Sequence, residues 1–150
     1  MKKLILIALG AFFSINLLFS QISDADQKKR DRLYNEGVEF IENQDYSQAL
    51  ASFNNCLLLD DTDARAYLLR ARVKTKLGDL GSAITDLDKA ISNDINLGEA
   101  YFYRGYLLYG SDESGILEEN LQMSIDLGFE RPEAYYLLGL SKLKEGDNDR

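Results

Sequence analysis

Residues 64–97 read "ARAYLLRARVKTKLGDLGSAITDLDKAISNDINL", and much of this pattern returns elsewhere in the chain at a fixed interval. The pair Ala66-Tyr67 recurs 34 residues later and once more after a further 34. A fixed period between 20 and 50 residues is typical of repeat architectures, in which each unit packs on its neighbours. We therefore divide the chain into three full units and a half unit or C-terminal capping helix, at residues 30–63, 64–97, 98–131 and 132–146.

Each complete unit contains two stretches of helical apolar spacing, separated by a turn. Asp45 and Asp79 stand at two of these turns, where a carboxylate can accept the free N–H groups that begin the second helix. Between units, Thr62 or Asp63 is expected to cap the next helix, "NLGEA" and "ERPEA" to act similarly, and Pro132 to suit a first helical turn. The sequence therefore predicts an all-α fold, an α-solenoid of antiparallel helical hairpins with about three and a half repeats and seven helices.

Small residues at fixed places in the units predict close contact between helices. Gly37, Ala71, Gly105 and Gly139 share one place in the first helix of each unit. Bulky residues stand at the facing place of the second helix, namely Phe53, Leu87 and Leu121. Two helices approach closely only where side chains are short, so these places should mark the interface within each hairpin.

The first twenty residues have the composition of a secretory signal peptide. Lys2 and Lys3 precede the apolar run "LILIALGAFFSINLLF", and Ser20 precedes a plausible cleavage point at Gln21. A membrane-spanning helix needs about 20 apolar residues, which is longer than this run. We expect residues 1–20 to be removed and the protein to be exported, periplasmic or secreted, with residues 21–29 as a lead-in and 147–150 as a tail. An uncleaved anchor that tethers the repeats to the inner membrane is the alternative.

Charge and composition exclude several kinds of partner. Without residues 1–20 the chain has 15 basic and 25 acidic residues, a formal charge of −10, and no basic run, so nucleic acid is not an expected partner. The chain has no second long apolar segment, so we expect no membrane insertion after cleavage. Cys56 is the only cysteine and lies in the apolar run "NNCLLL", so we expect it to pack in the core.

The residues needed for catalysis or metal binding are scarce. The chain has no histidine, which is the commonest general base and metal ligand, and one cysteine cannot build a zinc site. The acidic clusters Asp60, Asp61 and Asp63, and Asp112 and Glu113, stand at predicted turns where acids act as caps. "DDTDARAYLLRA" lacks the glycine and final glutamate of a calcium loop. We expect no enzymatic activity, no cofactor and no metal.

In its spacing the chain resembles the tetratricopeptide repeat family. The second unit carries a large apolar residue, a small residue four positions later and the turn "GDL" at 78–80, as that family does. The third unit departs, because its turn reads "GSDESG" and Leu117 replaces the small alanine, so we expect its helices to sit further apart or to shift in register. The resemblance implies protein or peptide binding without naming the partner.

The family lines its concave surface with the first helix of each unit, at positions −3, +1 and +4 from the small residue. Here those positions hold mostly aromatic and aliphatic side chains, which a water-facing surface would not favour unless it binds a partner. Packing between neighbouring helices is the alternative explanation for several of them. We call them the groove residues: Tyr34, Val38, Ile41, Leu68, Arg72, Thr75, Phe102, Tyr106, Tyr109, Tyr136, Leu140 and Leu143.

Some relatives hold the carboxylate ends of chaperone tails with a clamp of lysines, asparagines and an arginine. The corresponding positions here lack that chemistry, so an apolar peptide or an amphipathic helix is the better ligand. Those clamp positions hold Tyr34, Val38, Leu69, Glu99 and Tyr103.

Two arginines stand where the family more often has leucine. Arg70 and Arg104 could bind anions, but a structural role is favoured, with Asp86 and Glu119 as expected partners on the following helices.

The sequence thus predicts an exported, non-catalytic adaptor that binds a peptide or helix in its concave groove. Three alternatives stay open: an assembly subunit of an envelope complex that uses its convex face or its ends, a membrane-anchored structural repeat protein, and self-association through the C-terminal helix.

Overall fold

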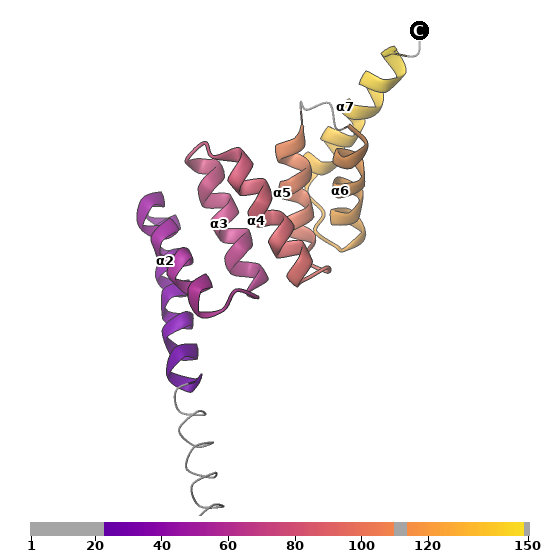
Figure 1. Ribbon diagram of the computed structural model, residues 1–150. Coiled ribbons are helices and arrows are strands. Elements are labelled where there is room, and N and C mark those ends of the chain that lie inside the picture. The colour runs from indigo at the N-terminus through magenta and orange to yellow at the C-terminus, as the bar shows by residue number, and fades with distance from the viewer. Residues whose placement is uncertain (1–22, 110–113, 149–150) are drawn as a thin grey trace, which may run out of the picture.

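The computed structural model describes residues 23–109 and 114–148, so the predicted signal peptide lies outside the described residues. Within that part the chain forms seven helices and no strand, which confirms the predicted fold class. The first helix covers residues 23–42, and the others are α2 (Tyr46–Leu59), α3 (Ala64–Lys76), α4 (Leu80–Asn93), α5 (Gly98–Leu108), α6 (Ser114–Asp126) and α7 (Pro132–Asn148). Successive helices run in opposite directions, and from α2 to α7 they follow one another in chain order across Figure 1. No helix in the described ranges is both long and apolar enough to cross a membrane.

Aspartate side chains begin three of the helices as predicted. Asp45 accepts from the Gln48 backbone N–H at 3.2 Å, and Asp79 caps α4 in the same way. Asp63 caps α3. The segment "NLGEA" does not cap α5 with a side chain, because the cap position is Leu97.

The small residues lie where the helices touch. A Cβ added at Gly37 would lie 2.7 Å from the Phe53 ring, and one added at Gly105 would lie 3.0 Å from Leu121. Ala71 is completely buried. The predicted interface is therefore present in all three hairpins.

The third hairpin keeps the geometry of the others, which corrects the expectation of a wider gap or a shifted register. Gly105 faces Leu121 across the same 16-residue separation that joins Gly37 to Phe53. Leu117 causes no separation of α5 from α6, because its side chain is buried in the apolar cluster that also contains Leu137 of α7.

Arginines join the second helices of successive units. Arg70 on α3 donates to both carboxylate oxygens of Asp86 on α4, at 2.8 and 2.7 Å, and also to Asn54 on α2 at 2.9 Å. The partner predicted for Arg70 is confirmed. Lys74 lies 2.8 Å from the same Asp86, whose side chain is only 4% exposed. The guanidinium of Arg70 is therefore engaged within the fold.

Arg104 repeats this arrangement one unit later. It donates to Asn120 on α6 at 2.7 Å and to Asp88 on α4 at 2.8 Å. The predicted partner Glu119 is wrong, because the residue one period after Asp86 is Asn120.

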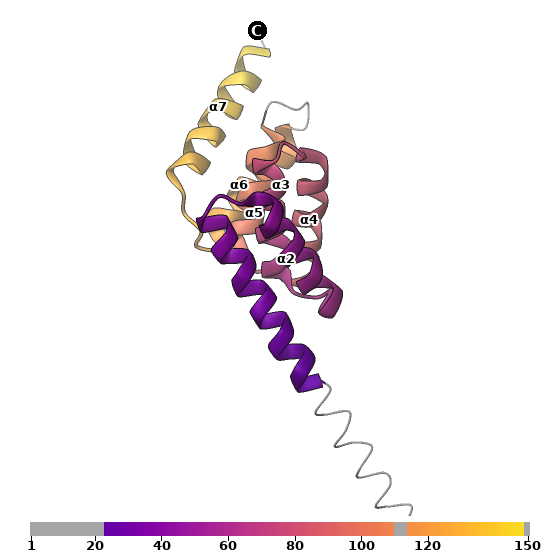
Figure 2. The same ribbon diagram turned by 90° about the vertical axis from the view of Figure 1, so that its left-hand side faces the viewer.

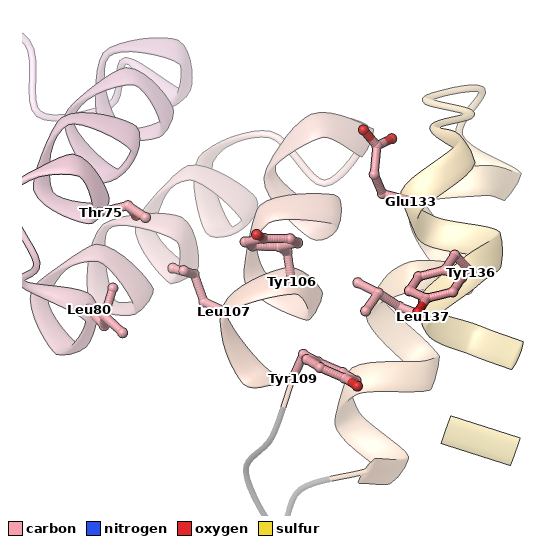
Figure 3. Close-up of a pocket in the computed structure, with 8 residues that line it drawn as sticks. All are labelled: Thr75, Leu80, Tyr106, Leu107, Tyr109, Glu133, Tyr136 and Leu137. Atoms are coloured by element: carbon pink, nitrogen blue, oxygen red, sulfur yellow. The ribbon is translucent and has the colours of Figure 1, made fainter. Parts of the chain in front are cut away.

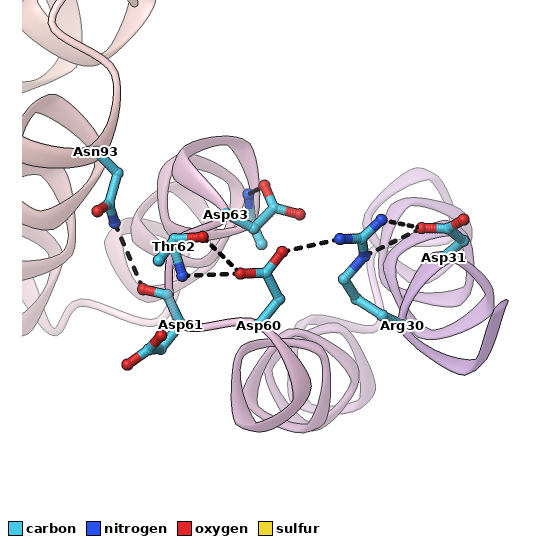
Figure 4. Close-up of polar contacts among 8 residues, drawn as sticks. Arg30, Asp31, Asp60, Asp61, Thr62, Asp63 and Asn93 are labelled. Atoms are coloured by element: carbon cyan, nitrogen blue, oxygen red, sulfur yellow. Dashed lines mark hydrogen bonds and ion pairs between the residues drawn. The ribbon is translucent and has the colours of Figure 1, made fainter. Parts of the chain in front are cut away.

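The acidic loop between α2 and α3 has a structural role (Figure 4). Asp60 accepts from the backbone N–H and the hydroxyl of Thr62 at 3.0 and 2.7 Å, and from Arg30 at 2.8 Å. Asn93 of α4 donates to the Asp61 carbonyl at 3.5 Å. The Asp60 carboxylate and the Asp61 backbone carbonyl thus fix this turn.

Candidate functional site

Four of the groove residues line one cavity of about 550 Å³ between α3, α5 and α7. They are Thr75, Tyr106, Tyr109 and Tyr136. Figure 3 shows Tyr106 on α5, Tyr109 directly after the end of α5, Tyr136 on α7, and Thr75 approaching from α3. All three tyrosines are at least half exposed, which is unusual for large apolar rings that serve only the core.

Phe102 lies one helical turn before Tyr106 and packs against its ring. Its side chain is 5% exposed, and its ring centroid lies 6.1 Å from Tyr106 and 5.7 Å from Phe129. Residues four apart lie on the same helix face, so burying Phe102 fixes the base on which Tyr106 stands. Phe102 thus holds the wall in place without facing solvent itself.

Apart from Thr75, the groove residues of the first two units do not line this cavity. Leu68 is 3% exposed and belongs to a buried cluster. Tyr34, Val38 and Ile41 are half-buried against the first core cluster, where Tyr34 meets Phe53 edge to face at 6.0 Å. These side chains pack against the core, and Tyr34 also lines a separate cavity together with Arg65. Burial raises the pKa of the Tyr34 hydroxyl.

The polar groove residues on α3 are engaged within the chain. Arg72 pairs with Glu99 of α5 at 3.3 Å and stands over the Tyr103 ring at 5.2 Å. The Thr75 hydroxyl donates to the Ala71 carbonyl at 2.9 Å, on its own helix. The Arg72 charge and the Thr75 hydroxyl are therefore both paired within the chain.

Four further residues line the cavity and were not predicted: Leu80, Leu107, Glu133 and Leu137. A signal for Glu133 existed in the repeat pattern. It stands six residues before the small residue Gly139, the same place that Glu99 and Arg65 hold in earlier units. Arg65 also lines a separate cavity, so this sixth place faces the inner surface as well. The other three are apolar residues whose exposure the periodic pattern does not specify.

The last two groove residues lie further along α7. Leu143 is 69% exposed and Leu140 is partly buried. The C-terminal half of α7 projects beyond α5 and α6 in both Figure 1 and Figure 2. These residues therefore continue the apolar surface past the cavity.

Nothing among the described side chains offers metal or thiol chemistry. No group of three or more potential metal ligands occurs in the ranges that the structure covers. Cys56 is buried, and burial raises the pKa of its thiol to about 11, so the reactive thiolate is scarce at neutral pH. What this surface can do is bind through apolar and aromatic contact.

Known proteins share this sequence pattern. Residues 64–94 match the tetratricopeptide repeat model. A TPR repeat-containing protein of Methanocaldococcus jannaschii is 29% identical over 117 residues, 77% of this chain and 20% of the relative. Tetratricopeptide repeat protein 36 of Danio rerio is 34% identical over 108 residues, 68% of this chain and 58% of the relative. The chain thus spans less than two thirds of either relative, and the matches support the tetratricopeptide repeat family.

Solved structures share the fold. The first TPR of Spaghetti, bound to an HSP90 peptide, has a TM-score of 0.73 and 17% identity, covering 79% of this chain and 94% of that one. The Yersinia enterocolitica type III secretion chaperone SycD, in complex with a peptide of the translocator YopD, has a TM-score of 0.70 and 22% identity, covering 77% and 93%. The described chain is thus an all-α tetratricopeptide-like solenoid.

Proposed function

We propose that this protein is an exported, non-catalytic adaptor that binds an apolar peptide or amphipathic helix at the cavity between α3, α5 and α7. The observation that carries the proposal is the group of exposed tyrosines, Tyr106, Tyr109 and Tyr136, around one concave space of about 550 Å³. Aromatic side chains that lose their water on binding dominate interface energetics.

The chemistry of the lining restricts the ligand. Leu80, Leu107 and Leu137 add aliphatic surface to the three rings. Glu133 is the one charged residue among the eight that line the cavity. We therefore propose a ligand that combines apolar side chains with a lysine or arginine near Glu133, since the tyrosine faces also attract cations.

The same chemistry argues against an acidic peptide tail as the ligand. Two of the carboxylate-clamp positions, Glu99 and Tyr103, hold a carboxylate and a phenol, and Arg72 nearby is already paired with Glu99. The Spaghetti domain binds an HSP90 peptide. This chain would need a different class of peptide.

A peptide selection tests the proposal. Peptides chosen from a random display library on the chain from Gln21 onward should be rich in apolar residues and contain a lysine or arginine. Tyr106→Ala and Tyr109→Ala should each weaken the selected peptides about tenfold in fluorescence anisotropy. Leu58→Ala is the matched control, because Leu58 is 83% exposed on α2 and does not line the cavity. Equal affinity for all variants would place binding elsewhere.

Export rests on the first twenty residues and has its own test. The charged start, the short apolar run and Ser20 at the junction support removal of the segment. The intact mass of the exported protein should correspond to a chain that begins at Gln21. Recovery of the uncleaved chain in the membrane fraction would favour the anchored alternative.

A further inference from the structure

Helix α7 is apolar on two opposite faces. Ala134, Leu137 and Ser141 are at most 7% exposed and face the body of the protein. The opposite face carries Tyr135, Tyr136 and Leu143, which are 51%, 67% and 69% exposed. A polar residue at the place that Val73 and Leu107 hold in earlier units would suit the water-facing side of a terminal helix, but Ser141 is only 7% exposed and faces inward. We call the outward residues Tyr135, Tyr136, Gly139, Leu140 and Leu143 the α7 stripe.

Gly139 makes this stripe different from an ordinary exposed patch. It holds the small-residue place that is covered by Phe53 at Gly37 and by Leu121 at Gly105. At Gly139 an added Cβ would meet nothing within 4 Å. The site where another helix can approach closely is thus present and uncovered in the described chain.

The charged residues beside the stripe are ordered so that an antiparallel second copy of α7 would bring opposite charges together. Glu133 stands near the start of α7, and Lys144 stands eleven residues later, three helical turns along the same flank. Lys142 lies on the other flank, two turns after Tyr135. An acidic and a basic side chain at opposite ends of one flank, as Glu133 and Lys144 are, attract the same flank of an antiparallel copy.

We propose that two copies of this protein associate through α7, antiparallel, with the two-fold axis near Gly139. In that register Leu143 lies against Tyr135 of the second copy, and Glu133 lies near Lys144 of the second copy. Each contact occurs twice, as in any two-fold interface. The glycines meet at the crossing point, where the helices come closest.

The charges beside the stripe favour a second copy of this chain, rather than an unrelated helix, as its partner. The contact between Glu133 and Arg131 on the same chain is 3.5 Å long and both side chains are half exposed, so it leaves the carboxylate accessible. Glu133 and Tyr136 of α7 also line the peptide cavity, so a second copy and a peptide would compete for them, and the dimer is therefore tested without peptide.

Cross-linking in cells tests the geometry with the full chain. Gly139→Cys should yield a covalent dimer with a short bifunctional maleimide, because the two thiols would face each other across the axis. Gly81→Cys is the matched control, since Gly81 is also helical with nothing within 4 Å of an added Cβ. Cys56 is fully buried and should give no background. No dimer at position 139, or equal yield at 81, would overturn the proposal.

A charge exchange tests the register by sedimentation of the chain from Gln21 onward, without peptide. Glu133→Lys should weaken the dimer about tenfold, because it places like charges opposite each other twice. Adding Lys144→Glu should restore the wild-type dissociation constant. A monomeric wild-type chain, or a double variant no stronger than the single one, would refute this pairing.

Discussion

The hairpin of α3 and α4 and the solitary helix α7 share one sequence pattern and differ in what surrounds it. In the hairpin, Ala71 is fully buried and Arg70 is bonded to both neighbouring second helices. In α7 the corresponding places are Gly139, which is open, and Leu138, which has no charge. At these two places α7 therefore makes fewer contacts with neighbouring helices than α3 does.

The caps show the same trend along the chain. Asp63 caps α3 with its side chain, while the equivalent residues before α5 and α7 are Leu97 and Arg131. The capping carboxylate is absent before both α5 and α7, and at α7 the bonded arginine and the cover over the small residue are absent as well. Side chains that do not pack against the rest of the chain are available to bind another molecule.

Removing α7 should have the largest effect on stability. Deleting residues 132–150 exposes Phe102, Leu117 and Leu121, which are now buried with Leu137. We expect a loss of about 4 kcal/mol in the free energy of unfolding, from the apolar area returned to water. Urea denaturation measures it. Leu58→Ser, at a residue that is 83% exposed on α2 and lies outside the α7 stripe, is the control and should leave the midpoint unchanged.

The charge cluster around Asp86 should come next. Asp86→Ala leaves Arg70 and Lys74 without their buried counter-charge and should cost about 3 kcal/mol in chemical denaturation. Asn120→Ala removes the neutral counterpart in the third unit and should cost about 1 kcal/mol. Equal losses at the two sites would show that the second unit gains nothing from its extra charges.

Overpacking the shared small-residue place compares the two regions directly. Ala71→Leu should destabilise the protein by about 2 kcal/mol, because the site is closed by α4. Gly139→Leu should cause no loss, since its site is open. Thermal melts at low protein concentration, where self-association is absent, provide the comparison, and matching melting temperatures for both variants would contradict the assigned register.

The smallest expected effect is the pH dependence of the α2–α3 loop. Hydrogen bonds from Thr62, and then the pairing with Arg30, hold the pKa of Asp60 below its ordinary value. A lowered folded-state pKa stabilises the protein above the unfolded pKa, and this stabilisation is lost as the pH falls through the folded one. The effect should be under about 1 kcal/mol because Asp60 is partly exposed.

Asp60→Asn tests it. The variant should lose less stability than the wild type when denaturation is compared at pH 7 and near pH 3. The loop before α7 has Gly128 at the equivalent place and contributes no such dependence. An identical pH profile for variant and wild type would remove the role assigned to the carboxylate.

Much of the fold could be predicted because it depends on local spacing. The 34-residue period, the caps at Asp45 and Asp79 and the burial of Cys56 all follow from residue order. The Arg70–Asp86 pair was also predictable, since both residues lie in one hairpin. The bond from Arg70 to Asn54 was not predicted, because it joins two different units.

The groove was predicted only in part for the same physical reason. Periodicity places a side chain on a helix face, and it says nothing about the depth of the neighbouring helix that covers the face. Phe102 and Tyr106 occupy the same kind of position, yet one is 5% exposed and the other 50%. Glu133 lines the cavity, although the repeat pattern indicated only that its position carries a charged residue.

The sequence by itself determined the repeat length, the number of helices and the register within the first two hairpins, because these follow from contacts between residues close in the chain. The tertiary structure alone decided which apolar positions stay accessible. Exposure depends on whether another helix arrives beside a residue, and the repeat pattern is the same in either case. Gly37 and Gly139 illustrate this, since one lies against Phe53 and the other has nothing within 4 Å of an added Cβ.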